Sequence, residues 1–331
     1  MNLTDELSGI DPHALPATLL DATTPVVVRG LVGDWPAVQA ARAGDILAYL
    51  RQHDAGTTVD ALIGPPEIEG RFFYNERVDG FNFARERLPF AAMLQALERW
   101  RGAARPPALY VGSTTVDVCL PHWRAANRLG FGELDPLVSI WLGNRTRIAA
   151  HQDLPANLAC VVAGRRRFTL YPPDALPDLY VGPLELTPAG QPISLVDPTR
   201  PDLERFPRYA AAAARAHTAE LGPGDAVLIP SLWWHHVQAL DEVNVLVNAW
   251  WRRVPAWMDG PIDALLHTLL SVRDLPDAER RVWRAMFDHY VFGARAEDVE
   301  HIPPAARGVL APLDAEAARR LRARLLHRLN R

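Results

Sequence analysis

Two short motifs in this sequence contain residue types that bind metal ions. His151 and Asp153 stand two positions apart, and His235 and His236 follow a tryptophan pair much later in the chain. Two histidines and one carboxylate make up the facial triad that holds Fe(II) and leaves the other positions open for a cosubstrate and dioxygen. The first motif alone is a weak signal, since short motifs also occur by chance in surface turns. A metal site is therefore a hypothesis that the surrounding residues have to support.

The residues around both motifs have the pattern of β-strands. Alternate residues of a strand share one face, so His151 and Asp153 would point to the same side. Asn157 has the same parity if that strand continues without a break. Adjacent residues face opposite sides, so only one of His235 and His236 can join them, and the spacing does not decide which. The competing interpretation is that the inward histidine only forms a hydrogen bond in the core.

A buried arginine is predicted on the strand 166–171. Arg166 shares one face of this strand with Phe168 and Leu170, so its guanidinium is expected among apolar side chains. A buried arginine needs an anionic partner, either a protein carboxylate or a bound acid. The planar guanidinium can bind a carboxylate through two parallel hydrogen bonds. A carboxylate-binding arginine beside a metal is what a 2-oxo-acid cosubstrate requires.

A polar residue interrupts the strongly apolar strand 243–251. Asn248 lies on the face opposite the valines of that strand. This position predicts a hydrogen-bond partner in the interior, because a buried amide without one is costly. A core asparagine that is merely satisfied by its neighbours is the alternative interpretation.

The elements that would position these side chains are mostly short strands. The stretches with strand pattern are 108–112, 137–142, 158–162, 166–171, 226–229 and 243–251. Short strands with regular turn signals are typical of a barrel or sandwich. The proline-rich stretch 172–206 lacks this pattern, and we interpret it as a long insertion and a candidate lid.

The pattern changes in three steps along the chain. Residues 1–105 are predicted to form a mixed α/β segment packed on the barrel. Residues 106–255 are predicted to form the barrel itself. Helical spacing dominates 256–331, which is therefore expected to be a C-terminal helical segment.

The composition argues against several classes of partner. The 331 residues carry a net charge of −4, so no bulk basic surface favours nucleic acid. All 35 basic residues are arginine, so an anion has to be held by arginine, histidine or backbone N–H groups. No apolar run is long enough to span a bilayer, and two cysteines cannot form a disulfide framework. We therefore expect a cytoplasmic protein without nucleic-acid or membrane partners.

Three stretches together resemble the JmjC and cupin-like hydroxylases, and within them the asparaginyl hydroxylases and their bacterial cupin-like relatives. They are PVVVRGLVGDWP at 25–36, the segment 140–171 with HQD and GRRRFTLY, and the segment 222–251 with GPGDAVLIP, WWHHV and VNAWW. The resemblance implies a mainly β fold with flanking helices, the double-stranded β-helix or jelly roll. It also implies Fe(II), 2-oxoglutarate as cosubstrate, O2, and hydroxylation with succinate and CO2 as coproducts.

Carried over by position, the resemblance implies roles for individual residues. His151 and Asp153 match the first two metal ligands. His235, directly after the tryptophan pair, matches the third, which leaves His236 facing outward. The residues that match positions near the cosubstrate or the metal are Tyr110, Asn157 and Asn248.

The chain departs from the family pattern at two positions. Arg166 stands where the family often has a carboxylate-binding lysine, and its longer fork needs a reshaped pocket. Ile148 stands where the family often has a threonine, which removes one hydroxyl contact. Both departures bear on the affinity for the cosubstrate more than on metal binding.

The resemblance also extends to a C-terminal helical segment, which forms the dimer in some members. Four leucines at helical spacing could supply such an apolar face: Leu265, Leu266, Leu269 and Leu270. Packing of this face against the barrel of the same chain is the alternative to a homodimer.

The resulting prediction is an Fe(II)- and 2-oxoglutarate-dependent oxygenase that hydroxylates a protein or peptide side chain or an amino-acid-like small molecule. A metal-dependent cupin enzyme that does not use 2-oxoglutarate is one alternative, and the inward arginine argues against it. A non-catalytic binding protein with the same fold is the other, and the intact ligand set argues against it. The substrate and the hydroxylated atom depend on the shape of the pocket.

Overall fold

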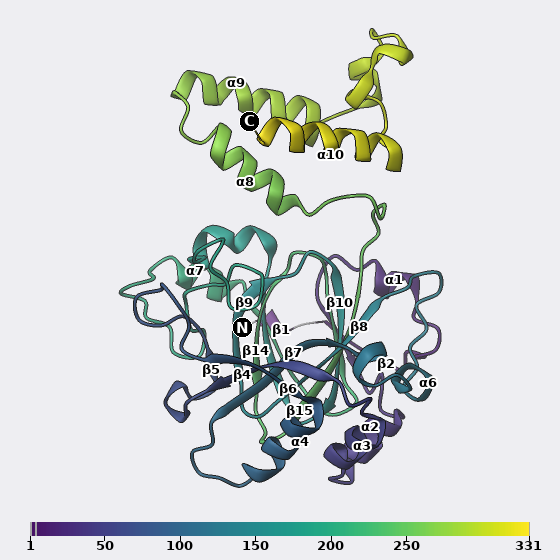
Figure 1. Ribbon diagram of the computed structural model, residues 1–331, viewed down its shortest axis with the longest axis vertical. Helices are drawn as coiled ribbons and strands as arrows, with labels where there is room; N and C mark the ends of the chain where they lie inside the picture. The colour runs from purple at the N-terminus through teal and green to yellow at the C-terminus, as the bar shows by residue number, and fades with distance from the viewer. Residues whose placement is uncertain (1, 4, 331) are drawn as a thin grey trace. The chain divides into compact units, whose positions relative to one another are not determined.

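The computed structural model describes residues 2–3 and 5–330, and the chain divides into two compact units, Met1–Arg252 and Arg253–Arg331. The first unit contains two β-sheets with helices around them, and the second consists of helices and connecting turns (Figure 1). The predicted mainly β fold with flanking helices is confirmed. The predicted division of the first unit at residue 105 stays a prediction.

The smaller sheet has six strands and carries the three motif histidines, His151, His235 and His236. Its strands, in spatial order, are β1 (Asn2–Leu3), β12 (His217–Leu221), β11 (Arg166–Tyr171), β14 (Trp234–Ala239), β9 (Arg147–Gln152) and β5 (Arg71–Phe72). The four central strands pair antiparallel with one another, whereas the edge strand β5 pairs parallel with β9 and the edge strand β1 pairs parallel with β12.

The larger sheet has nine strands. In spatial order they are β2 (Asp5–Ser8), β3 (Val26–Arg29), β13 (Ala226–Ile229), β10 (Ala156–Ala163), β15 (Asn244–Trp251), β8 (Leu137–Gly143), β7 (Ala108–Thr115), β4 (Thr58–Gly64) and β6 (Ala84–Pro89). From β8 to β11 and again from β12 to β15, consecutive strands fall in one sheet and then the other. This alternation is the connectivity of a double-stranded β-helix, or jelly roll.

The core lies on both faces of the larger sheet. Its inner face packs against the smaller sheet, where Val161 and Ile229 meet Phe168 and Leu170. Its outer face is covered by helices, which is why β10 is buried along almost its whole length. The helices that contribute buried side chains to this outer core include α2 (Pro36–Arg42), α3 (Ile46–His53), α4 (Phe90–Arg99), α1 (Ala17–Leu20), α5 (Val116–Cys119) and α6 (Trp123–Ala126).

The insertion predicted at 172–206 lies in the connection between β11 and β12. The regular elements of this connection are the 3-10 helix η2 (Pro173–Asp178) and the helix α7 (Tyr209–Ala214). The connection packs on a small core of its own that includes Tyr171 and Trp234. Ile193 also forms a bridge with His151, and the Ser194 N–H donates to the Ala150 carbonyl over 2.7 Å. The insertion is therefore fastened to the strand that carries the first motif.

The described part of the second unit contains three helices of more than two turns, within the segment 256–331 where helical spacing dominates. They are α8 (Pro261–Ser271), α9 (Asp277–Phe287) and α10 (Ala315–Leu329). Shorter elements are η1 (Pro66–Ile68) in the first unit and, in the second, η3 (Asp288–Phe292), η4 (Ala296–Val299), η5 (Pro304–Ala306) and η6 (Gly308–Leu310). The carboxylate of Asp314 caps α10 by accepting from the Ala317 N–H. Within the described residues, the structure has no helix with the length and apolar character of a bilayer span.

Candidate active site

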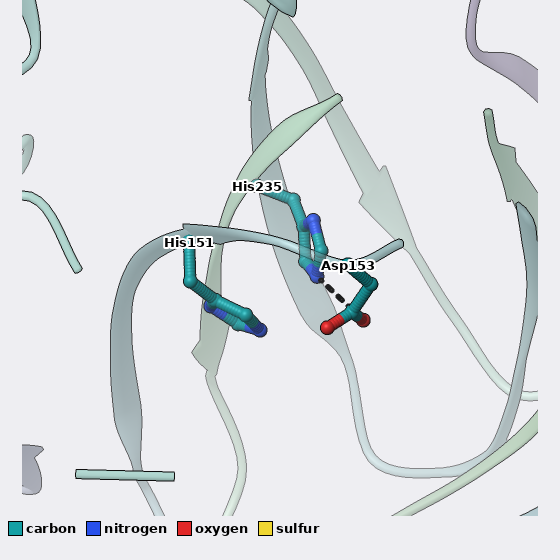
Figure 2. Close-up of side chains that lie close together, drawn as sticks. All are labelled: His151, Asp153 and His235. Carbon is teal, nitrogen blue, oxygen red and sulfur yellow. Dashed lines mark ion pairs between the residues drawn. The ribbon is translucent and has the colours of Figure 1, made fainter. Parts of the chain in front are cut away.

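Three side chains from the two sequence motifs converge between the sheets. His151 lies near the end of β9, Asp153 follows that strand, and His235 lies on β14 directly opposite His151. One nitrogen or carboxylate oxygen from each lies within 4.8 Å of the others, and His235 Nε2 lies 3.6 Å from the nearer oxygen of Asp153 (Figure 2). The strand pairing therefore brings together the donor set that the sequence predicted.

Backbone hydrogen bonds orient both imidazole rings. Nδ1 of His151 lies 2.9 Å from the Ala149 carbonyl oxygen, and Nδ1 of His235 lies 3.0 Å from the Trp233 carbonyl oxygen. A carbonyl can only accept, so each Nδ1 carries the proton and each Nε2 presents a lone pair. This is the arrangement that fixes the tautomer of a metal-binding histidine. Together with the carboxylate of Asp153, the donors fit a divalent first-row metal with open positions.

Burial of the triad favours the neutral form of the His235 imidazole. His235 is 4% exposed and Asp153 is 7% exposed. Burial, together with the neighbouring His151, lowers the pKa of His235 to about 4, while Asp153 acts in the opposite direction. A deprotonated imidazole is the form that binds metal, so the site keeps His235 ready for a ligand role at neutral pH.

The neighbouring histidine lies on the other face of β14. His236 is opposite Thr169 of β11 and is also buried. The charged groups that act on it are Asp197, which belongs to the insertion, and the arginines Arg71 and Arg147. The parity argument left the choice between the two histidines open, and the fold brings His235 to the triad.

The acid sensitivity of the metal-free protein should depend on His236. Burial lowers the pKa of His236 from 6.5 to about 4, so the unfolded chain binds this proton more readily. Acidification from pH 7 to 4.5 should therefore cost the folded state on the order of 2 kcal/mol through this group. His236→Gln removes the titration, so its loss of unfolding free energy over this range should be smaller by that amount. Denaturant unfolding with a chelator present measures it, and equal losses in both proteins would contradict the assignment.

The two asparagines predicted near the site are paired with each other. The Asn248 amide donates to the side-chain oxygen of Asn157 over 2.7 Å, and both residues line the same cavity as the triad. Asn157 reaches this place by a different route from the one predicted. The strand of His151 ends at Gln152, and a new strand in the other sheet begins at Ala156. Asn157 therefore does not lie on the strand of His151, and the condition that one unbroken strand joins them was wrong.

Arg166 and Tyr110 lie in the same cavity, which has a volume of about 200 Å³. Arg166 is only 1% exposed, and its Nε and Nη2 atoms have no hydrogen-bond partner among the described residues. Burial lowers the pKa of Arg166 to about 10, while Tyr110 acts in the opposite direction. Burial raises the pKa of Tyr110, so its hydroxyl stays protonated. The guanidinium thus faces inward with free donors, as the strand parity predicted.

The cavity also contains residues that the sequence did not single out. The indole N–H groups of Trp141 and Trp250 are buried without a partner, and both rings line the cavity. Trp250 shares a strand face with Asn248, so the same parity argument could have placed it there. The insertion adds Pro188 and Gln191 to the lining. No periodic signal marks these two residues, because they lie in irregular backbone.

Comparison with known proteins agrees with the architecture. Residues 12–256 match the family described as cupin-like domain. The chain is 30% identical over 258 residues to the human bifunctional peptidase and (3S)-lysyl hydroxylase JMJD7, a match that covers 69% of this chain and 77% of that protein.

Two further relatives match over shorter stretches. Lysine-specific demethylase JMJ31 of Arabidopsis thaliana is 36% identical over 129 residues, which is 37% of this chain and 23% of that protein. HSPB1-associated protein 1 of Rattus norvegicus is 37% identical over 116 residues, which is 34% of this chain and 23% of that protein. The family match extends over both motifs, the strand of Arg166 and the jelly roll that positions them. The chain therefore belongs to the cupin-like family, the JmjC-type group of Fe(II)- and 2-oxoglutarate-dependent oxygenases.

Proposed function

We propose that this protein is a hydroxylase in which His151, Asp153 and His235 hold Fe(II) and Arg166 binds the distal carboxylate of 2-oxoglutarate. The proposal rests on one observation, that the metal-binding triad and the carboxylate-binding arginine line the same cavity. A triad with free Nε2 lone pairs and a buried guanidinium with two unused donors line the same space. A cupin enzyme that binds a metal and does not use 2-oxoglutarate would not need the buried guanidinium of Arg166. When bound, iron and 2-oxoglutarate supply the oxidising chemistry with O2 and release succinate and CO2.

The residues of the chain bind and orient the cosubstrate. Arg166 offers two N–H donors in a plane, which suits a carboxylate held at two points. The Tyr110 hydroxyl, protonated because it is buried, is a further donor at this end. Asn157 and Asn248 hold each other in place, and the unpaired oxygen of Asn248 remains available as an acceptor. Apolar neighbours such as Phe168 exclude water and so strengthen these contacts.

The choice of the third ligand predicts different outcomes for two adjacent histidines. Wild-type protein should form succinate only when both Fe(II) and 2-oxoglutarate are present. His235→Ala should reduce this turnover at least about 100-fold, because it removes a metal donor. His236→Ala should keep most of it, because that side chain faces Asp197 on the other side of β14. Succinate assays with matched metal content measure both variants, and loss in His236→Ala alone would reverse the assignment.

Membership of the family indicates only a broad class of substrate. We propose a protein or peptide side chain, or an amino-acid-like small molecule, entering next to the insertion. Pro188, Gln191 and Ile193 of the insertion line the cavity, which supports a role for this segment as a lid over the substrate.

We also propose a cytoplasmic location. Cys119 and Cys160 are both buried as free thiols, which suits a reducing compartment.

We further propose that the helical unit forms a homodimer. Leu265 of α8 is 46% exposed and Leu270 is 79% exposed, so the other helices of the unit leave them uncovered. Val282 and Trp283 of α9 are exposed as well. Exposed apolar side chains on two helices favour an interaction site, and a second copy of the same unit would bury them.

Charged substitutions on this surface should therefore separate the subunits. A double variant, Leu265→Glu with Leu270→Glu, should shift the protein from dimer to monomer, because two carboxylates would be desolvated in the interface. Light scattering after size-exclusion chromatography measures the mass. Leu176→Glu is the matched control, since Leu176 is 50% exposed on η2 in the other unit. A wild-type monomer, or a double variant that stays dimeric, would contradict the proposal.

A further inference from the structure

Few charged side chains line the active-site cavity. Among the described residues that line it, Asp153 is the only carboxylate and Arg166 the only guanidinium. The imidazoles of His151 and His235 are neutral when their Nε2 atoms bind a metal. The charge that a substrate meets in the cavity is therefore set by these two ionised side chains and by whatever is bound between them.

The cavity has a closed end and an open end. At the closed end Arg166 and Tyr110 are both buried. Arg166 stands four residues along β11 from Leu170, the partner of His235, which separates the two backbone levels by about 13 Å. His151 is the most exposed member of the triad. A cosubstrate that reaches from the metal to Arg166 fills the closed end, so the substrate has to approach from the side of His151.

The rest of the cavity wall, apart from the triad and Arg166, is uncharged. The insertion contributes Pro188, Gln191 and Ile193, and Ile193 is bridged directly to His151. Strand β7 contributes Ser113. The carboxamide of Gln191 and the hydroxyl of Ser113 offer neutral donors and acceptors, and the other side chains offer apolar surface. None of these groups neutralises a cation.

The charges of the loaded site cancel. The two positive charges of Fe(II) and the one of Arg166 balance the two negative charges of 2-oxoglutarate and the one of Asp153. We propose that this site accepts a neutral group, an aliphatic or carboxamide side chain, and excludes lysine-like and arginine-like cations. The inference rests on the proposed function and narrows its substrate.

Desolvation is the physical reason for the exclusion. An ammonium group that enters the cavity leaves its water shell, and it is stable there only if an opposite charge receives it. Asp153 cannot serve, because the metal uses its charge. Two relatives are named for lysine as their substrate, the human lysyl hydroxylase and the plant lysine-specific demethylase. The proposal therefore separates this chain from those relatives in substrate charge.

The test compares two small probes, pentanamide and pentylammonium, which have similar length and differ in the charge of one end. The 331-residue chain is loaded with Mn(II) and N-oxalylglycine, which have the charges of Fe(II) and 2-oxoglutarate. Bound Mn(II) shortens the proton relaxation times of any molecule held beside it, and Zn(II)-loaded protein is the diamagnetic control. We expect the relaxation enhancement of pentanamide to exceed that of pentylammonium by about tenfold or more.

A charge placed in the wall should reverse this preference. Gln191→Glu adds a carboxylate to the cavity, so pentylammonium should gain enhancement and pentanamide should lose it. Leu184→Glu is the matched control, because it adds the same charge to the insertion at an exposed position that does not line the cavity. It should leave the ratio of the two probes unchanged.

The outcomes separate this inference from the proposed function. Water-proton relaxation first reports whether Mn(II) binds at all, and failure there overturns the proposed function together with the inference. With Mn(II) bound, equal or greater enhancement for pentylammonium overturns the neutral-substrate inference alone. Absence of enhancement for both probes also overturns it, since a neutral pocket should then hold the amide. A Gln191→Glu variant with the wild-type ratio also overturns it, because the inference places the substrate against the wall that contains Gln191.

Discussion

Asp153→Ala is expected to lower iron-dependent succinate formation at least about 100-fold, and His151→Ala should do the same. Each removes one of the three donors whose atoms lie within 4.8 Å of one another. Two remaining donors cannot hold Fe(II) against competing chelators at the same strength, and the Asp153 carboxylate is the only anionic donor of the triad. Succinate formation at saturating 2-oxoglutarate measures the effect, and metal content after gel filtration measures its cause.

The matched control is the residue between the two ligands. Gln152 belongs to the same strand and its side chain points to the opposite face. Gln152→Ala should therefore keep wild-type turnover, whereas the two flanking variants lose it. Asp153 is 7% exposed, so its replacement by alanine removes a buried charge and should leave the metal-free fold intact. Turnover like that of wild type in either ligand variant would refute the triad.

Strand periodicity predicted the part of this site that lies on regular strands. Arg166 faces inward on β11 as the alternation predicted, and Asp153, one residue beyond the end of β9, still lies beside His151. The choice of His235 over His236 needed more than spacing. Alternation only says that the two histidines point apart, and the pairing of His235 with His151 determines which one reaches the triad.

The rest of the site depends on backbone that has no period. Asn157 lines the cavity although the chain turns between Gln152 and Ala156 and enters the other sheet. Gln191 and Pro188 line it from an irregular connection, whose path is set by packing on Tyr171 and Trp234 and not by its own sequence pattern. Contacts between distant segments of this kind leave no local signal. The part of the lining that the insertion contributes could therefore not be predicted from the sequence.

The second large effect is expected on cosubstrate affinity. Arg166→Ala should raise the KM for 2-oxoglutarate by about 100-fold, because the distal carboxylate would be buried without its cationic partner. The guanidinium is 1% exposed and its Nε and Nη2 atoms have no partner among the described residues, so no protein carboxylate competes for it. The metal triad is unchanged in this variant, so Mn(II) binding in the absence of 2-oxoglutarate should remain close to wild type.

A neighbouring arginine and a conservative change make this prediction specific. Arg167 lies on the outer face of the same strand and pairs with Glu220 over 3.0 Å, so Arg167→Ala should leave the KM unchanged. Arg166→Lys should recover part of the affinity, because it restores the charge and lacks the planar fork. A merely structural role for Arg166 would lower kcat, stability and metal binding together, and lysine would not rescue the KM selectively. If Arg166→Ala has the wild-type KM, the carboxylate is bound elsewhere, and the buried guanidinium then needs another anion, because its position in an apolar interior is unstable without one.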